Sequence, residues 1–250
     1  MSPSNTKKSS RWIYAFLATV VFLLFIGASF FVYPESTKVV TQYPEVPKAL
    51  DVEAVESVSL VTKTVIVAFG DSITAGYGIA LADSYPAQLE RALTHLEYEV
   101  VVVNSGVTGE TSAGGLRRAS FVAAQKPDIV LLALGGNDVL RGVDPASTRK
   151  NLASTIEIFE EADARVILLG MYAPSNLGET YVNQFNAIYP ALAKEYNVPL
   201  IPFLLDRVAL VPAFNQQDGI HPNKEGARII AEENILPKLE ALLKEIEQKK

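Results

Sequence analysis

The stretch that decides the fold of this chain is Val65-Ile66-Val67-Ala68-Phe69-Gly70-Asp71-Ser72-Ile73-Thr74. Its first half is apolar without alternation, which is typical of a central parallel strand buried on both faces. Its second half leads into a helical segment, so Ser72 is predicted on a tight turn at the carboxyl edge of a sheet. Backbone N–H groups at the start of that helix favour negative charge there. This position suits a nucleophile whose attack creates an oxyanion, although a serine that only caps the helix is the alternative.

From residue 64 onward, strand-like and helical stretches alternate. The expected strands are Val65–Phe69, Glu99–Val103, Ile129–Leu134, Arg165–Gly170 and Val198–Pro202, and the expected helices cover about 84–96, 112–125, 146–162, 179–196 and 223–247. Right-handed crossovers between such elements build a parallel sheet between two layers of helices. The sequence therefore predicts an α/β fold, a three-layer, doubly wound (flavodoxin-like) sheet of five parallel strands.

Composition narrows the function classes. The chain has 250 residues, of which 49% are apolar and 20% charged, enough for one domain with a full core and an additional segment. It contains no cysteine, which excludes a disulfide framework and a thiolate metal site. The net charge is −6 and the basic residues are scattered, so no nucleic-acid partner is expected.

The N-terminal part has the pattern of a membrane anchor. Residues 1–11 contain Lys7, Lys8 and Arg11 but no acid, and residues 12–33 contain no charge. At about 1.5 Å per residue this span reaches roughly 33 Å, enough to cross a hydrocarbon core of about 30 Å. We predict a cytoplasmic N-terminus (1–11), a transmembrane signal-anchor helix (12–33), an extended tether (34–63) and a globular domain (64–250) on the extracytoplasmic, periplasmic or extracellular side. A cleaved signal peptide and a buried core helix are the alternatives.

Two loops at the predicted carboxyl edge carry candidate hydrogen-bond donors. Asn104–Thr111 contains Gly109, whose N–H could face a bound anion, although a plain turn glycine fits as well. Gly135-Gly136-Asn137-Asp138 follows the third strand, and Asn137 offers an uncharged side-chain donor. The alternative for Asn137 is a turn residue that tolerates unusual dihedral angles.

A late segment, Asp218-Gly219-Ile220-His221, carries a candidate proton acceptor. The carboxylate can hold Nδ1–H of His221 and leave Nε2 free to take a hydroxyl proton, although an exposed turn histidine is the alternative. His95, the other of the two histidines, falls within a predicted helix and is expected to be a surface or packing residue. Neither histidine has the neighbours of a metal site, so no metal is expected.

In this order, the segments around Ser72, Gly109, Asn137 and His221 resemble the four sequence blocks of the SGNH (GDSL) hydrolase family, over roughly residues 65–237. The resemblance is closest to the bacterial thioesterase I, lysophospholipase and arylesterase branch. It is supported by Ala75-Gly76-Tyr77-Gly78, by residues 105–112, by Leu140-Arg141-Gly142 and by residues 188–195. The chain departs from the family in Ile73, where leucine is more frequent, and in its anchor and tether.

The resemblance implies roles for the site residues. Ser72 would be the nucleophile, His221 the general base and then the acid, and Asp218 the residue that orients His221. The oxyanion hole would comprise the N–H groups of Ser72 and Gly109 and the amide of Asn137.

The resemblance also implies a reaction and its partners. We expect a monomer without cofactor that hydrolyses ester or thioester bonds of small molecules or lipids through an acyl-enzyme. The alternatives are an O-acetylesterase acting on cell-wall or capsule carbohydrate and, from another class, a catalytically silent, membrane-tethered binding module.

Overall fold

The computed structural model describes residues 63–248, and within them the chain forms a sheet of five parallel strands in the order β2-β1-β3-β4-β5. The strands are β1 (Thr64–Gly70), β2 (Val100–Gly106), β3 (Ile129–Ala133), β4 (Arg165–Leu169) and β5 (Leu200–Ile201). The order reverses at β1, as in doubly wound flavodoxin-like folds, so the predicted architecture of the domain is confirmed.

The predicted anchor and tether lie outside the described residues. Between residues 63 and 248, every helix is too short or too polar to span a bilayer.

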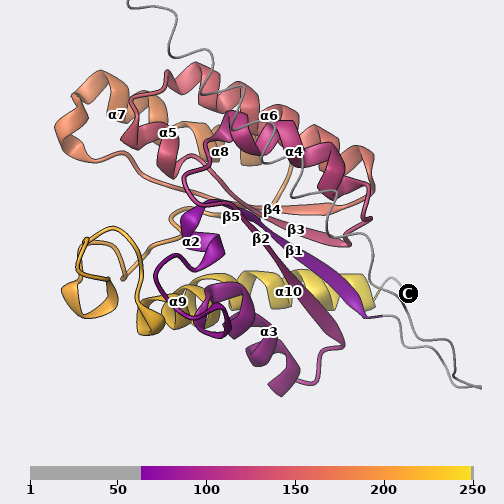
Figure 1. Ribbon diagram of the computed structural model, residues 1–250. Coiled ribbons are helices and arrows are strands. Elements are labelled where there is room, and N and C mark those ends of the chain that lie inside the picture. Colours follow the sequence, from indigo (N-terminus) through magenta and orange to yellow (C-terminus); the bar gives the residue numbers. More distant parts are fainter. Residues whose placement is uncertain (1–62, 249–250) are drawn as a thin grey trace, which may run out of the picture. The chain divides into compact units, whose positions relative to one another are not determined.

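Helices cover both faces of the sheet (Figure 1). They are α2 (Ser72–Ala75), α3 (Tyr85–His95), α4 (Ser112–Ala123), α5 (Gly136–Leu140), α6 (Pro145–Glu161), α7 (Glu179–Asn186), α8 (Ile188–Glu195), α9 (Lys224–Ile229) and α10 (Leu236–Glu247), with a π-helical stretch, Ile230–Ile235, between the last two. Short 3-10 turns lie at Leu81–Asp83, Ser175–Leu177 and Pro212–Phe214.

Strand β1 explains why two helical layers are needed. Ile66 and Ala68 face the layer of α3, α9 and α10, whereas Val67 and Phe69 face the layer of α4, α6 and α8. All four side chains are buried, because successive residues of a strand point to opposite faces. A strand that is apolar on both faces therefore lies in the middle of the sheet, where it carries Ser72 to the carboxyl edge.

Two predicted helices are interrupted. The expected helix over 179–196 breaks at Ala187, and the expected helix over 223–247 passes through the π-helical stretch before α10. A proline explains each interruption: Pro190 lies in the first turn of α8 and Pro237 in that of α10. Proline has no N–H and its ring clashes with the carbonyl of the preceding turn, so an unbroken α-helix is disfavoured there.

The predicted and observed bounds differ most in β2 and β5, and by at most one residue at either end in the other strands. Strand β2 continues to Gly106 instead of ending at Val103, because Asn104–Gly106 pair with Ala68–Gly70. Strand β5 has only two residues, since Pro199 and Pro202 flank it and proline cannot donate to a ladder. The longer β2 brings the loop that contains Gly109 level with the end of β1.

Candidate active site

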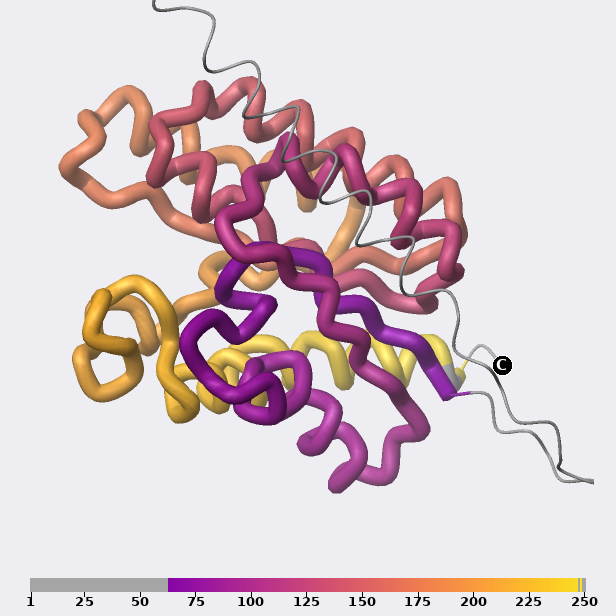
Figure 2. Tube along the Cα trace, in the orientation of Figure 1, coloured from indigo at the N-terminus to yellow at the C-terminus, as the bar shows by residue number. Residues whose placement is uncertain are grey.

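Four segments meet at the carboxyl edge of the sheet: the turns after β1, β2 and β3, and the loop 215–222 before α9 (Figure 2). Hydrogen bonds connect them. Val107 N–H donates to the carbonyl of Gly70 (3.0 Å), and Gln216 Nε2 donates to the carbonyl of Tyr77 (2.6 Å). The start of β1 and the end of α10 lie at the opposite edge (Figure 2). The fold thus brings together the four segments that carry the predicted site residues.

Ser72 is the first residue of α2, directly after the end of β1. The N-cap of α2 is Asp71, whose Oδ1 accepts the N–H of Ile73 at 3.0 Å. The alternative in which Ser72 serves only as the cap is therefore wrong, and its hydroxyl is available for other contacts.

Ser72, His221 and Asp218 form a hydrogen-bonded chain. Ser72 Oγ lies 2.9 Å from His221 Nε2, and His221 Nδ1 lies 2.7 Å from Asp218 Oδ2. Asp218 also accepts the N–H groups of His221 (3.0 Å) and Ile220 (2.9 Å) on Oδ1. The backbone N–H of His221, its ring and the N–H of Ile220 lower the pKa of Asp218 to about 2. The carboxylate is thus ionised at neutral pH, so Nδ1 carries the proton and Nε2 can accept one from Ser72.

His221 is held in place by the loop around it. Gln216 N–H donates to the carbonyl of His221 (2.8 Å), and its Nε2 donates to the carbonyl of Pro222 (3.0 Å). The ring of Tyr77 lies 4.7 Å from the imidazole, centroid to centroid. His95, in contrast, is an exposed residue of α3 whose Nδ1 contacts the carbonyl of Arg91, as expected of a surface histidine.

Two of the candidate oxyanion donors, Asn137 and Gly109, lie in α5 and in the loop after β2. Asn137 is in the first turn of α5, and its Nδ2 donates to Asp71 Oδ2 at 3.3 Å, which leaves the second N–H free for a ligand. Gly109 has φ +78°, and Gly135, the N-cap of α5, has φ +115° with Tyr189 Oη so close that a Cβ would meet it at 2.1 Å. Both positions therefore require glycine.

Three side chains tie the Gly109 loop to its surroundings. Arg141 Nη2 donates to the carbonyl of Gly109 (2.8 Å). Buried Asp138 accepts Ser112 N–H (2.7 Å) and Ser112 Oγ–H (2.5 Å). Arg118 makes a bidentate contact with Glu110, and it also donates to Ser105 Oγ (2.8 Å) and to the carbonyl of Gly70 (3.1 Å). The guanidinium of Arg118 thereby connects the end of β1, which carries Ser72, to the loop after β2.

Asp71 is a buried carboxylate beside Ser72. Only 4% of the residue is exposed, and burial raises its pKa to about 6, although the bonds from Ile73 and Asn137 act in the opposite direction. An unfolded chain ionises this carboxyl near its ordinary value of 3.8. Between these two values the folded protein binds more protons at Asp71 than the unfolded chain does, so stability falls as the pH rises.

This linkage predicts the effect of Asp71→Asn. Between pH 4 and 7, the free energy of unfolding of the wild type should fall by about 2 kcal/mol relative to the variant, since each pKa unit is worth about 1.4 kcal/mol and the unfolded carboxyl is already partly ionised at pH 4. Urea unfolding of both proteins at intervals of half a pH unit measures the difference, and any constant cost of the lost contact with Asn137 cancels. Parallel pH profiles would show that Asp71 titrates normally.

The cavity beside Ser72 is small, and Ser72 itself is largely buried. A recess of about 10 Å³ lies beside Ser72 and His221, between Tyr77, Tyr85 and Ile230, and it can hold no more than a water molecule. The larger hollows, of about 680 and 770 Å³, are lined by β5, the segments beside it and α10, and include neither Ser72 nor His221. Neither of these two hollows therefore gives a substrate access to Ser72.

Sequence reasoning missed the residues that support the site. It placed Arg118 in a helix without a role, and Asp71 only beside the serine. An acidic residue directly before a helix is a typical N-cap, so the cap at Asp71 could have been predicted. The contacts of Arg118 with Glu110 and Gly70 depend on how α4 packs against the sheet, and no local pattern indicates them.

Comparison with known proteins identifies the chain. The model of the GDSL-like lipase/acylhydrolase family matches residues 68–229. The chain belongs to this family. The matched family is one of lipases and acylhydrolases, and the chain is accordingly an ester-hydrolysing serine hydrolase, as the sequence predicts. The family resemblance seen in the sequence is thus confirmed.

Several esterases and a thioesterase are similar to this chain in sequence or structure. Esterase TesA of Pseudomonas aeruginosa is 40% identical over 175 residues, 70% of this chain and 87% of that protein. Thioesterase 1/protease 1/lysophospholipase L1 of Escherichia coli K12 is 40% identical over 164 residues, 65% of this chain and 77% of that protein. AlinE4, an SGNH-hydrolase family esterase with a known crystal structure, is 42% identical in sequence to this chain. The two structures superpose with a TM-score of 0.62 over 74% of this chain and 98% of AlinE4.

Proposed function

We propose that the protein hydrolyses carboxylic esters and thioesters through an acyl-enzyme on Ser72, with His221 as proton carrier and Asp218 as its orienting partner. The single observation that carries the proposal is the hydrogen-bonded chain from Ser72 through His221 to Asp218, with distances of 2.9 and 2.7 Å. A nucleophile, a base and a group that orients the base are the parts that acyl transfer requires.

The reaction has two steps with the same proton carrier. Ser72 Oγ attacks the ester carbonyl and its proton moves to His221 Nε2, so that a tetrahedral oxyanion forms. The oxyanion collapses, and the alcohol or thiol leaves with the proton from Nε2. Water then attacks the acyl-enzyme, gives its proton to Nε2, and frees the acid when the proton returns to Ser72 Oγ. Asp218 stabilises the imidazolium without becoming protonated.

The oxyanion would be stabilised by the N–H groups of Ser72 and Gly109 and by Asn137 Nδ2. Asn137→Ala removes one of these three donors and should lower kcat about 10²–10³-fold with little change in KM, because the oxyanion exists only after attack. Steady-state kinetics with p-nitrophenyl butyrate measure the effect. Asn183→Ala, at an exposed site on α7, is the matched control and should behave as wild type. A loss confined to KM would contradict the assigned role.

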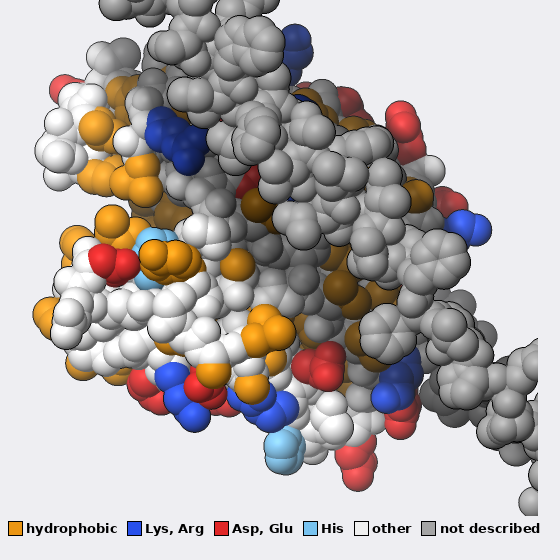
Figure 3. All heavy atoms as spheres, in the orientation of Figure 1, with side chains coloured by type: hydrophobic (Ala, Val, Ile, Leu, Met, Phe, Trp, Pro, Cys, Tyr) orange, Lys and Arg blue, Asp and Glu red, His pale blue; other side chains and the backbone are white. Residues whose placement is uncertain are grey.

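The surroundings of Ser72 favour substrates with an apolar chain. Tyr77, Val107, Leu140 and Ile220, here called the apolar rim, are between 44% and 62% exposed. Each lies close in sequence or space to a site residue: Tyr77 contacts His221, Ile220 precedes it, and the other two lie near Gly109 and Asn137. Figure 3 shows hydrophobic side chains gathered around a histidine on one side of the molecule. An acyl chain lying across the rim would cover these side chains. We therefore propose single-chain lipid esters and aryl esters as substrates.

A panel of substrates tests this proposal. Purified residues 64–250 should hydrolyse p-nitrophenyl esters, acyl thioesters and lysophospholipid, and should be slower on acetylated glycan. Activity on acetylated glycan alone would instead indicate a carbohydrate O-acetylesterase. Absence of activity on every substrate would contradict the enzymatic proposal.

The location is a separate proposal. The uncharged span 12–33 after Lys7, Lys8 and Arg11 supports a membrane anchor with the hydrolase domain outside the cytoplasm. Protease added to the outside of the membrane should release the domain and leave the N-terminus in the membrane fraction. A free mature protein that begins near residue 30 would show a cleaved signal peptide instead.

A further inference from the structure

Arg141 lies between the two loops that carry the proposed oxyanion donors. It follows α5 as the C-cap, where its N–H donates to the carbonyl of Asn137 at 3.2 Å. Its Nη2 donates to the carbonyl of Gly109 at 2.8 Å, and the residue is exposed. The guanidinium is therefore held at a defined place, yet it has further N–H groups that face solvent.

The acidic residues near the site are already bound elsewhere. Asp218 is paired with His221, Glu110 with Arg118, and Asp138 with Ser112, while Asp144 accepts Ser147 N–H and Oγ–H at 3.2 Å. Among residues 63–248, no carboxylate pairs with Arg141. The proposed site thus has a positive charge at its mouth that the protein does not neutralise.

Arg141 lies close to one of the proposed oxyanion donors. The N and O atoms of one residue are separated by three bonds, at most about 4 Å. Because Nη2 lies 2.8 Å from the Gly109 oxygen, it lies at most about 7 Å from the Gly109 N–H. An anionic group two or three bonds from the ester of a bound substrate would reach the guanidinium.

We propose that Arg141 binds a negatively charged group on the alcohol side of the substrate, so that the enzyme prefers single-chain amphiphiles with an anionic head near the ester. The apolar rim supplies a surface for the acyl chain, and Arg141 supplies the partner of the head. A guanidinium binds phosphate or carboxylate through charge-assisted hydrogen bonds. This inference rests on the proposed function and specifies its substrate class.

Matched esters test the proposal. The first pair is 4-carboxyphenyl butyrate and its methyl ester, and the second is 1-decanoylglycerol 3-phosphate and 1-decanoylglycerol, used below their micellar concentrations. Within each pair the acyl group and the bond that is cleaved are the same. Arg141→Met should lower the ratio of kcat/KM for the anionic over the neutral ester about tenfold, equivalent to about 1.4 kcal/mol. Arg141→Lys retains the charge and should keep most of the ratio.

The design separates binding of an anion from support of the Gly109 loop. If Arg141 acted only through the Gly109 carbonyl, Arg141→Met would slow both esters equally and leave the ratio unchanged, which would overturn the proposal. Raising the salt from about 0.05 to 0.5 M should move the wild-type ratio toward that of the variant, because salt screens exposed charges. Hydrolysis of the neutral ester by the wild type tests the proposed function separately. If the wild type hydrolysed neither ester, the proposed esterase function would be wrong. If it hydrolysed both esters and the ratio did not depend on Arg141, only the charge preference would be wrong.

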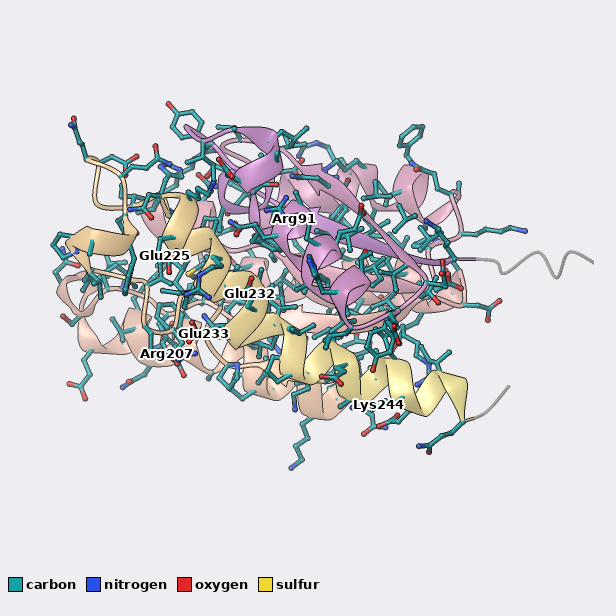
Figure 4. All side chains as sticks on the ribbon, turned by 90° about the horizontal axis from the view of Figure 1, so that it is seen from below. Arg91, Arg207, Glu225, Glu232, Glu233 and Lys244 are labelled. Atoms are coloured by element: carbon teal, nitrogen blue, oxygen red, sulfur yellow. The ribbon has the colours of Figure 1, made fainter. Side chains whose placement is uncertain are left out.

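Arg91→Met is the matched control. Arg91 is an exposed residue of α3 that also donates to one backbone carbonyl, that of Ala82, at 2.7 Å. It lies in the helical layer of α3 and α10 (Figure 4), whereas Arg141 follows α5 in the other layer. Its replacement removes the same charge and should leave the ratio at the wild-type value. An equal fall in both variants would show an effect of net charge and would overturn the proposal.

Discussion

Ser72→Ala should lower kcat for p-nitrophenyl butyrate about 10⁶-fold, the largest loss expected of any single substitution in the domain. Without Oγ no acyl-enzyme can form. The residual rate would come from water attacking an ester that is bound and polarised by Gly109 and Asn137, and such catalysis is about 10³–10⁴-fold above the reaction in water. The fold should persist, because the removed hydroxyl does not cap α2: Asp71 does.

Two measurements make this result specific. A fluorophosphonate should add one adduct to the wild-type protein, with the mass change on the peptide that contains Ser72, and none to the variant. Ser120→Ala, at an exposed position of α4, should keep both full activity and the adduct. An adduct on another residue of the Ser72→Ala protein would assign the nucleophile elsewhere.

His221→Ala should lower kcat almost as far, about 10⁵–10⁶-fold, because serine and histidine act as one unit. The imidazole is the group that contacts Ser72 Oγ, at 2.9 Å, so its loss leaves the hydroxyl proton without an acceptor. His95→Ala is the control, since His95 is an exposed residue on α3 whose Nδ1 contacts the carbonyl of Arg91 in the same helix. Activity loss in the control with an intact fold would contradict the assignment.

The loss of kcat in Asp218→Ala, measured with the same ester, completes the comparison of the three hydrogen-bonded residues. We expect a smaller loss, about 10⁴-fold, because this carboxylate orients and stabilises the imidazole but does not touch the reacting atoms. Loss equal to that of Ser72→Ala would mean that Asp218 has a further role. Comparison of the three variants on one ester thus tests the order of contacts from Asp218 through His221 to Ser72.

The sequence could predict the sheet because its signal is local. The apolar run of β1 and the alternation of strands with helices are properties of short windows, and the five predicted strands correspond to β1–β5. The prediction of unbroken helices through Pro190 and Pro237 was wrong. The apolar periodicity continues through both prolines and favours one helix in each case, although proline itself disfavours an unbroken helix. The extension of β2 to Gly106 could not be predicted, since it depends on pairing with Ala68–Gly70.

In the candidate site, too, some features could be predicted from local sequence and others could not. The residues that meet at the carboxyl edge could be named from the sequence, because each follows a strand or lies in a marked turn. Their supporting contacts could not. Arg118 reaches Gly70 and Glu110, and Arg141 reaches Gly109, only after α4 and α5 have packed against the sheet. The burial of Asp71, which raises its pKa to about 6, is also a property of the packed molecule.

Both ends of the described domain, the start of β1 and the end of α10, lie at the edge of the sheet away from Ser72 (Figure 2). A peptide linker, an affinity tag or a solid support attached through either end should therefore leave the mouth of the site open to solution. The same arrangement favours circular permutation, in which a linker joins these two ends and new ends are opened in an exposed turn such as that at Asp163, between α6 and β4. The enzyme could thus be immobilised or circularly permuted through this edge of the sheet without changes to the residues around Ser72.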